Sequence, residues 1–455
     1  MTDPKAPKAI WPDVPEPLMP YSPAVKAADW IFVSGQLASD FKTGIAPEAI
    51  PDNPALQNEQ DLQSRFVLDN LKRTLAAGGA DISKDVARIW QWLPWDTPTY
   101  DDFLSGNSWP DGLSITPYLD ARNEYIFDPR PASTAVSIRA LPVRGAHIEI
   151  DMIAITDGSE PQGFSPGPEV PMPLAGYSPA LRRGDWVFLA GEVPTDWVGD
   201  YGEARSMGPE SALANRARIN PHVWYGSEIE AQTDYTLWKL QKIAESAGAS
   251  FKRAVKAEVY LGHPNDYQGM DKVWKRWFPD NPPARVVIPY MGLGTRGSRI
   301  EIALTLLADD SELEIETIET SEAPEPFSHE PQAVKVGNFL FLSQQMACDS
   351  RGVLADGMLR HENFPWYGLP GQLQMRYMMK NIAAICEAGG TSVENIVRRA
   401  CFHDEGDHFY DSIEEWSKYF PGVKPASTTM KIGGPLVVPG ANTLLDLIAY
   451  VPDPA

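Results

Sequence analysis

The chain contains 455 residues with a mass of 50.2 kDa, which at roughly 100–200 residues per domain predicts two to four domains. Hydrophobic residues make up 43% of the chain, enough to fill packed interiors, so extensive disorder is excluded. The formal net charge of -22, from 39 Lys and Arg against 61 Asp and Glu, disfavours nucleic acids and anionic membranes as partners.

A pattern that predicts two paired strands occurs three times along the chain. The three segments are YSPAVKAADWIFVSGQ at 21–36, YSPALRRGDWVFLAGE at 177–192 and EPQAVKVGNFLFLSQQ at 330–345. Each has a small-residue start, a polar turn and an aromatic-rich strand. Copies spaced by about 150 residues indicate repeated whole domains rather than short solenoid units.

An amphipathic helix is predicted after each strand pair. In the first copy Val67, Leu71 and Leu75 recur at helical spacing, and the helix is expected to end at Gly78-Gly79, because glycine suits the left-handed residue that closes a helix. The later copies repeat the pattern with Leu237, Leu240 and Ile243 before Ala247-Gly248, and with Met378, Ile382 and Ile385 before Gly389-Gly390. The order of elements therefore repeats as well as the strand motif.

The remaining elements also recur in the same order. A strand is predicted at 86–92, 254–261 and 396–402, followed by a second, aromatic-rich helix and a Pro-Ala pair. The pairs are Pro131-Ala132, Pro283-Ala284 and Pro425-Ala426, and the last closing strands are expected at 147–155, 299–307 and 443–451. We therefore predict three homologous α+β domains, each a mixed sheet packed with two helices.

The predicted boundaries follow from composition. Residues 157–173 are rich in Pro, Gly and Ser, and residues 309–322 form an acidic run with few apolar anchors. The expected organisation is an N-terminal arm (1–19), domain 1 (20–157), a linker (158–175), domain 2 (176–308), an acidic linker (309–324) and domain 3 (325–455).

In this order of elements, each copy resembles the Rid (YjgF-like, RidA-like) family of imine and enamine deaminases. The most specific pieces are YSPAV…VSGQ in the first copy and PAR…RIEI in the second. The resemblance implies a chorismate-mutase-like fold and, because single domains of the family form trimers with ligand sites in the three clefts between subunits, an intramolecular pseudo-trimer. Further homo-oligomerisation stays open.

The resemblance also implies site residues, position by position. The family arginine that grips the substrate carboxylate follows Pro-Ala; it is present as Arg285 but replaced by Ser133 and Ser427 in the other copies. The glutamate that positions water matches Glu149 and Glu301, with Leu444 in the third copy. Tyr21 and Tyr177 match the family tyrosine, which Glu330 replaces in copy three. Ser34 matches the family serine, and Asp271 stands at the position of the family asparagine. Backbone groups near Val287 would complete the pocket.

These residues suggest one principal cleft around Arg285 and Glu301, because only the second copy keeps both. A guanidinium matches a carboxylate bidentately and would orient a 2-imino or 2-enamino acid, while the glutamate would activate water and pass protons to the leaving amine. No metal and no organic cofactor is required, because an imine carbon is already electrophilic. The sequence does not decide whether copy one (Tyr21, Ser34) or copy three (Glu330, Ser343) faces Arg285 across the cleft; we expect copy one, because it keeps its family residues.

Other interpretations remain open from the residues alone. Arg285 is also compatible with a surface salt bridge, Glu149 and Glu301 with a solvated strand face, and Tyr21 and Tyr177 with caps at the domain starts. A chorismatase-like hydrolase of a cyclic carboxylate, or a pseudo-trimer that binds a metabolite without turnover, are the alternative functions. Insertions at 104–123 and 199–230 would narrow the cleft around a larger substrate.

The compartment is predicted from what the sequence lacks. Its three cysteines form no CxxC pair, its apolar runs are far shorter than the roughly 20 residues of a membrane span, and its N-terminus has no apolar signal segment. A cytoplasmic protein acting on a small molecule is the expectation.

Overall fold

The computed structural model of the chain describes residues 3–94, 115–167, 170, 173, 175–196, 213–219, 226–359 and 368–453. Most of the two expected insertions, at 104–123 and 199–230, lies outside these residues. Among the described helices, none combines the length and the apolar character needed to cross a bilayer.

Each of the three domains contains a six-stranded sheet and two main helices. Domain 1 comprises β1 (Lys8–Ile10), β2 (Ala24–Ala27), β3 (Trp30–Leu37), α1 (Glu59–Ala77), β4 (Val86–Pro94), α3 (Thr116–Arg122), β5 (Ala132–Ile138) and β6 (Glu149–Ile155). Domain 2 comprises β7 (Gln162–Phe164), β8 (Ala180–Arg183), β9 (Trp186–Glu192), α5 (Glu228–Ser246), β10 (Ala249–Leu261), α6 (Tyr267–Trp277), β11 (Ala284–Ile288) and β12 (Ile300–Ala308). Domain 3 comprises β13 (Ile315–Ile318), β14 (Ala333–Val336), β15 (Phe339–Leu342), α7 (Pro370–Ala388), β16 (Ile396–His403), α8 (Phe409–Ser417), β17 (Ala426–Lys431) and β18 (Thr443–Tyr450).

The three sheets share one topology. The strand orders are β1-β2-β3-β6-β4-β5, β7-β8-β9-β12-β10-β11 and β13-β14-β15-β18-β16-β17, and in each sheet the final pair is parallel. The segments expected to be an arm and two linkers each contribute an edge strand, β1, β7 and β13. A short strand extends a sheet there because the neighbouring strand would otherwise leave its backbone groups unpaired.

Local sequence signals account for the limits of the long helices. In α1 the side chain of Asn58 accepts a hydrogen bond from the backbone of Asp61, and the turn after the helix passes through Gly79 at a φ of +83°. In α5 Ser227 makes the equivalent cap to Glu230. These helices end where the glycines of the sequence predict, and each begins after a polar N-cap residue.

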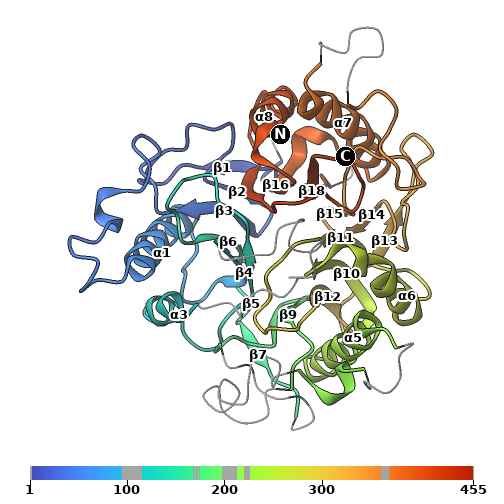
Figure 1. Cartoon of the computed structure of the whole chain (residues 1–455), viewed down its shortest axis with the longest axis horizontal. Helices are drawn as coiled ribbons and strands as arrows, with labels where there is room; N and C mark the ends of the chain where they lie inside the picture. The colour runs from blue at the N-terminus through green and yellow to red at the C-terminus, as the bar shows by residue number, and fades with distance from the viewer. Residues whose placement is uncertain are drawn as a thin grey trace.

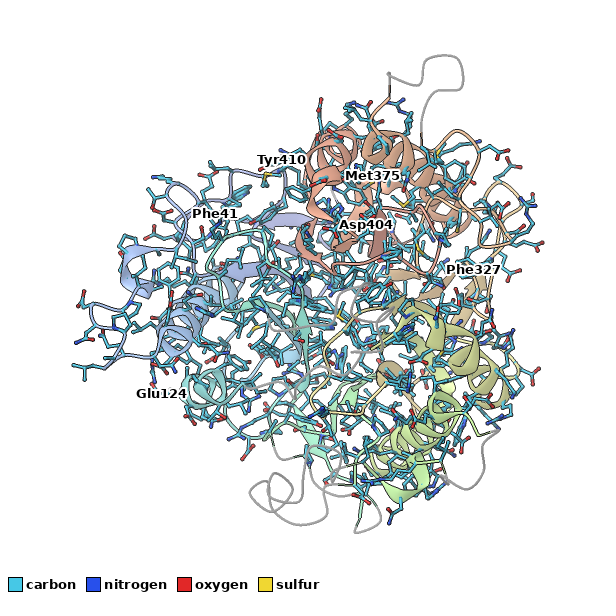
Figure 2. The ribbon with its side chains drawn as sticks, in the orientation of Figure 1. Phe41, Glu124, Phe327, Met375, Asp404 and Tyr410 are labelled. Atoms are coloured by element: carbon cyan, nitrogen blue, oxygen red, sulfur yellow. The ribbon has the colours of Figure 1, made fainter. Side chains whose placement is uncertain are left out.

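The sheets face inward and the helices lie outside, so the three domains surround a shared core (Figure 1). Every residue of β3 is buried, because one face of its sheet packs on helices and the other on the neighbouring domains. At the centre, the Trp30 ring lies 4.9 Å from the Trp186 ring and 4.8 Å from the Phe339 ring. The side chains in Figure 2 fill this interior, whereas Tyr410, 72% exposed, lies on the outer helical layer.

A chain of buried ion pairs links the same interior surfaces. Three cations at corresponding strand positions, Arg88, Lys256 and Arg398, each reach a carboxylate of the next domain. The ion pairs are Arg88–Glu258 at 2.9 Å, Lys256–Asp446 at 2.6 Å, Arg398–Asp151 at 3.2 Å and, within domain 3, Arg398–Asp446 at 3.0 Å. The contacts run from domain 1 to 2, from 2 to 3 and from 3 back to 1.

This cyclic order creates three clefts between neighbouring domains, each beside the strand that follows Pro-Ala. We name them by their domains: the 1–2 cleft between β5 and β9, the 2–3 cleft between β11 and β15, and the 3–1 cleft between β17 and β3. In each, a strand of the first domain meets the strand of the second that contains the Ser34-Gly35 position or, in domain 3, ends directly before its equivalent, Ser343-Gln344. The candidate site residues are distributed among these clefts.

Candidate functional site

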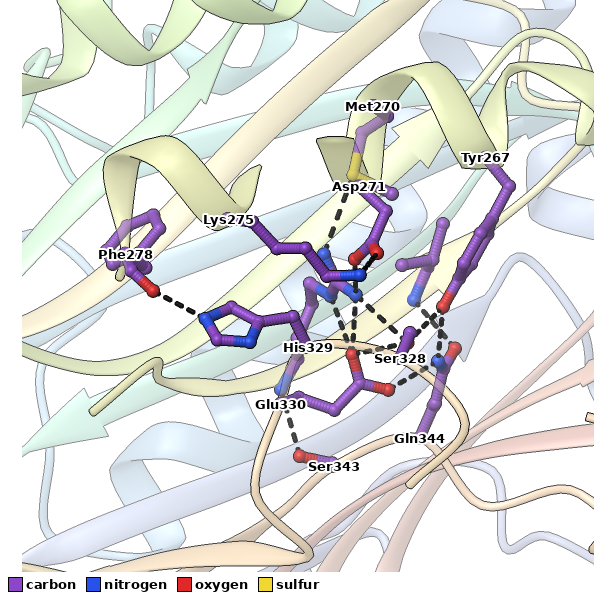
Figure 3. A network of polar contacts seen from close by, with 12 residues as sticks. Tyr267, Met270, Asp271, Lys275, Phe278, Ser328, His329, Glu330, Ser343 and Gln344 are labelled. Carbon is purple, nitrogen blue, oxygen red and sulfur yellow. Dashed lines mark hydrogen bonds and ion pairs between the residues drawn. The ribbon is translucent and has the colours of Figure 1, made fainter. Parts of the chain in front are cut away.

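Arg285 lies in the 2–3 cleft, where protein carboxylates neutralise it (Figure 3). Its side chain is fully buried, and Nη2 lies 2.6 Å from Oε2 of Glu330 and 2.7 Å from Oδ1 of Asp271. Although burial disfavours its charge, Glu330 and the neighbouring acidic groups raise the pKa of Arg285. The guanidinium is thus paired from both sides, by α6 of its own domain and by domain 3.

The expectation that copy one faces Arg285 is wrong. The backbone N–H of Arg285 donates to Ser343 Oγ at 3.2 Å, and its carbonyl accepts from the backbone of Gln344 at 2.8 Å, both from domain 3. Tyr21 and Ser34 lie in the 3–1 cleft instead. The cyclic order of the domains decides this pairing, and sequence similarity to the family does not encode that order.

Replacements in domain 3 fill the 2–3 cleft from within. Gln344 stands where the other copies have glycine; its Oε1 accepts from the Val287 backbone at 3.3 Å and its Nε2 donates to Glu330 at 2.7 Å. Leu444 replaces the family glutamate. The Glu330 carboxylate therefore pairs with the guanidinium that was expected to bind a substrate carboxylate.

The expected partnership of Arg285 with Glu301 is also wrong, because the two side chains leave opposite faces of the sheet. Glu301 pairs with Tyr260 on β10, and Tyr260 pairs with Ile288 on β11. Ile288 is three residues beyond Arg285, and side chains alternate between faces along a strand. Arg285 therefore points toward α6 and Glu301 toward domain 1.

Glu301 lines a cavity of about 280 Å³ in the 1–2 cleft. Domain 2 contributes Glu301, Tyr177 and Gly191, and domain 1 contributes most of the remaining lining residues. The other lining residues are Gln91, Ile115, Thr116, Leu119, Arg122, Ser133, Ala135, Ala175, Val193 and Gly294. Gly191 is required here, because a Cβ at this position would overlap Oε1 of Glu301 and lie 2.7 Å from Thr134 Oγ1.

The environment of Glu301 favours its protonated form. Burial, followed by the nearby carboxylate of Glu192, raises the pKa of Glu301 to about 8. Glu192 itself is held by Lys239 Nζ at 2.6 Å and accepts a hydrogen bond of 3.2 Å from the Tyr177 hydroxyl. The cavity thus presents a neutral carboxylic acid near pH 7, beside a tyrosine in a defined position.

Two further polar residues of this cavity are absent from the sequence-based site. Arg122, 3% exposed, donates from Nη2 to the Ala175 and Gly176 carbonyls at 2.8 Å, and its Nε is buried without a hydrogen-bond partner. Gln91 accepts from Ser133 Oγ at 3.0 Å, and its Nε2 also has no partner. Arg122 lies nine residues before Pro131, the position of a tryptophan in the other copies. Comparison of the three copies at this position would have identified it.

The 3–1 cleft contains Tyr21, Ser34 and Glu149. Ser34 Oγ accepts from the backbone of Ser427 at 2.8 Å, and Glu149 accepts a backbone hydrogen bond from Thr429. Burial, followed by Asp151, raises the pKa of Glu149 well above its usual value. The residues predicted as one site therefore lie in three places: Arg285, Asp271 and Val287 in the 2–3 cleft, Glu301 and Tyr177 in the 1–2 cleft, and Tyr21, Ser34 and Glu149 in the 3–1 cleft.

Comparison with known proteins agrees with the threefold repeat. The family described as Endoribonuclease L-PSP matches residues 12–92, 168–308 and 320–450. A RutC family protein of Pyrococcus abyssi is 30% identical over 26% of this chain and 77% of its own length. The 3-aminoacrylate deaminase RutC of Acinetobacter baylyi is 28% identical over 29% of this chain and 87% of its own length.

Among solved structures, RidA from an Antarctic Psychrobacter is 26% identical, with a TM-score of 0.25, over 30% of this chain and 99% of its own. Each of these relatives matches less than a third of the chain. Because the family description matches most of the sequence in three separate regions, this protein belongs to the Endoribonuclease L-PSP family, the family of the Rid and RutC proteins, and carries three tandem copies of its domain.

Proposed function

We propose that the 1–2 cleft is a cofactor-independent deaminase site, which hydrolyses an imine or enamine of a small carboxylate and releases ammonia. The observation that carries the proposal is one cavity lined by Glu301, Tyr177 and two residues with buried, unpartnered donors, Gln91 and Arg122, in which burial raises the pKa of Glu301 to about 8. The family's deaminase relative supports the same reaction class.

Arg122 provides the carboxylate anchor in this proposal. Its pKa is lowered by burial, yet an arginine in a protein remains charged, and although Tyr118 lies beside the guanidinium, Nε makes no hydrogen bond with a protein group. A substrate carboxylate on the cavity side of Arg122 would neutralise it, while Gln91 Nε2 would donate to a second substrate oxygen. The apolar walls formed by Ile115, Leu119 and Val193 accommodate a hydrocarbon side chain.

Glu301 supplies the protons in the proposed reaction. The neutral acid protonates the β-carbon of an enamine, which converts it to an iminium and leaves a Glu301 carboxylate. That carboxylate accepts a proton from water as the water oxygen bonds to the iminium carbon. The proton then passes from Glu301 to the amine nitrogen, the C–N bond breaks and ammonia leaves. The hydroxyl proton returns to the Glu301 carboxylate as the carbonyl forms, which regenerates the neutral acid. For an imine the sequence begins with protonation of its nitrogen.

The test is ammonia release from 2-imino acids generated in situ by an amino-acid oxidase, with semicarbazide trapping of the surviving imine. We expect acceleration by the wild type, loss with Glu301→Gln and with Arg122→Met, and retention with Arg285→Met. A wild type no faster than buffer would overturn the proposal. Carboxylate binding without turnover would then identify the non-catalytic alternative.

A further inference from the structure

A buried ion pair beside the 1–2 cavity distinguishes domain 2 from the other two domains. Nζ of Lys239, on α5, lies 2.6 Å from Oε2 of Glu192, the last residue of β9, and the two side chains are 1% and 2% exposed. Lys239 also donates to the Val193 and Thr195 carbonyls at 3.4 and 3.3 Å. Three acceptors therefore hold the ammonium group in one place.

The corresponding residues of the other copies are neutral. Glu192 ends the repeated strand motif, and Lys239 lies within a helix of 19 residues, a length that α1 and α7 share. The residues at the same positions are Gln36 and Asn70 in domain 1, and Gln345 and Asn381 in domain 3. Domain 2 thus differs from both by two replacements whose charges balance each other.

The fold does not require these charges. Domains 1 and 3 form the same sheet and the same long helix with a Gln and an Asn in place of the ion pair. Neutral replacements of a buried ion pair are often as stable as the pair itself, because burying two charges is costly. The effect of the charges must therefore be sought in the cavity that domain 2 lines.

Glu192 connects the ion pair to two residues of that cavity. Its Oε1 accepts from the Tyr177 hydroxyl at 3.2 Å. Because a tyrosine has a single hydrogen to donate, the Tyr177 oxygen is left as an acceptor toward the cavity. Glu192 also pairs in register with Ile302, the residue after Glu301, and its charge is the largest influence after burial that favours the protonated form of Glu301.

Other titratable groups surround Glu301. Those that act on it or line its cavity are Arg88, Lys239, Tyr177, Tyr260 and Arg122. The first two favour the charged form of Glu301, each less strongly than Glu192 opposes it. The tyrosines stay neutral, because burial raises the pKa of both hydroxyls well above its usual value. Loss of the whole ion pair should therefore lower the pKa of Glu301, and loss of Glu192 alone should lower it further.

We propose that Glu192 and Lys239 are positioning residues of the 1–2 site, which keep a fixed negative charge beside Glu301 and orient the Tyr177 hydroxyl, so that Glu301 enters the reaction as an acid. Neither is among the described residues that line the cavity, so both act through other residues. Their role in catalysis rests on the proposed deaminase function, whereas their effect on the protonation of Glu301 does not depend on turnover.

Replacing Glu192→Gln together with Lys239→Asn tests this role, because it introduces the residues that the other two domains already contain. Infrared titration follows the carboxylic acid band of Glu301, which is assigned by its absence in Glu301→Gln. We expect the midpoint to fall from about 8 in the wild type by about one pH unit in the double variant, and by more in Glu192→Gln alone. An unchanged midpoint in the double variant would overturn the proposal.

The matched control removes the same two charges from the exposed side of α5. Lys242 lies 3.0 Å from Glu245, and these side chains are 35% and 45% exposed. Glu245→Gln with Lys242→Asn should leave the midpoint of Glu301 unchanged, and a shift equal to that of the buried double variant would contradict the proposal. If the buried double variant does not fold, Glu192→Gln with Lys239→Met removes the same charges and should give the same lowered midpoint.

Kinetics separate this role from the deaminase function itself. The fall of kcat/KM at alkaline pH should begin at a lower pH in the buried double variant, in step with its infrared midpoint. A shifted infrared midpoint in a protein whose wild type releases no ammonia would remove the deaminase function and leave the effect on Glu301. Ammonia release with the same pH profile in both proteins would remove the positioning role alone.

Discussion

Glu330 Oε2 lies 2.6 Å from Nη2 of Arg285, across the boundary between domains 3 and 2. Glu330 stands at the sequence position that Tyr21 and Tyr177 hold in the other copies. A single replacement therefore places an internal carboxylate in the 2–3 cleft, which is the cleft that retains the family arginine. This contact gives the buried Arg285 a counter-ion within the protein, whereas Nε of Arg122 in the 1–2 cleft has no hydrogen-bond partner.

Arg285→Met should destabilise the protein without removing activity. The change leaves Glu330 buried without its cation, and removal of one partner of a buried pair costs about 3–5 kcal/mol. Adding Glu330→Gln should recover most of the loss, because Asp271 keeps its 2.9 Å contact with Lys275. Urea unfolding midpoints of the single and double variants measure this, and equal midpoints would show that the ion pair is not needed.

The deaminase activity should depend on protonation of Glu301. With a pKa of about 8, the acid form is lost as the pH rises through that value, so kcat/KM should fall roughly tenfold per pH unit above it. The pH–rate profile of ammonia release measures this dependence. A rate that instead increases up to pH 8 would mean that the carboxylate acts first as a base.

The same group should make stability depend on pH. Because the folded pKa of Glu301 lies above the usual 4.5, the folded state holds this proton more tightly than the unfolded state. Its contribution is complete below pH 4.5 and is lost as the pH rises to about 8. Urea midpoints of the wild type and of Glu301→Gln should be measured from pH 5 to pH 9. The midpoint of the wild type should fall relative to that of the variant as the pH rises.

Two glycines of the 1–2 cavity provide a matched pair of variants. A methyl group on Gly191 would overlap the Glu301 carboxyl, whereas a methyl group on Gly294 would meet no atom within 4 Å. We therefore expect Gly191→Ala to lower kcat at least tenfold and Gly294→Ala to leave it nearly unchanged. Similar losses in both variants would indicate that cavity volume, rather than the position of Glu301, limits the rate.

The interior ion pairs should stabilise the association of the domains. Arg398→Met leaves Asp151 and Asp446 without this cation and should lower the free energy of unfolding by about 3–5 kcal/mol. Lys84→Met, which removes an exposed pair with Glu160, is the control and should have no measurable effect. Denaturant unfolding of both variants provides the comparison.

The sequence by itself determined the domains and their elements. Threefold recurrence of strand pairs, amphipathic helices and Pro-Ala pairs predicted three α+β units, because apolar periodicity and the glycines that close helices act locally. The same comparison identified Glu301 and Tyr177, which do share a cavity. The edge strands β1, β7 and β13 were not predicted, because a three- or four-residue strand has little pattern of its own.

Only the tertiary structure decided which residues meet. Arg285 and Glu301 are sixteen residues apart and belong to one sheet, yet strand alternation directs them into different clefts. Arg122, on α3, lines the same cavity as Ser133, the residue at the position of the family arginine in the first copy. An arginine side chain is long enough to bring its charge to one point from several backbone positions. The residue that follows Pro-Ala in the sequence therefore does not reveal where the positive charge lies in the structure.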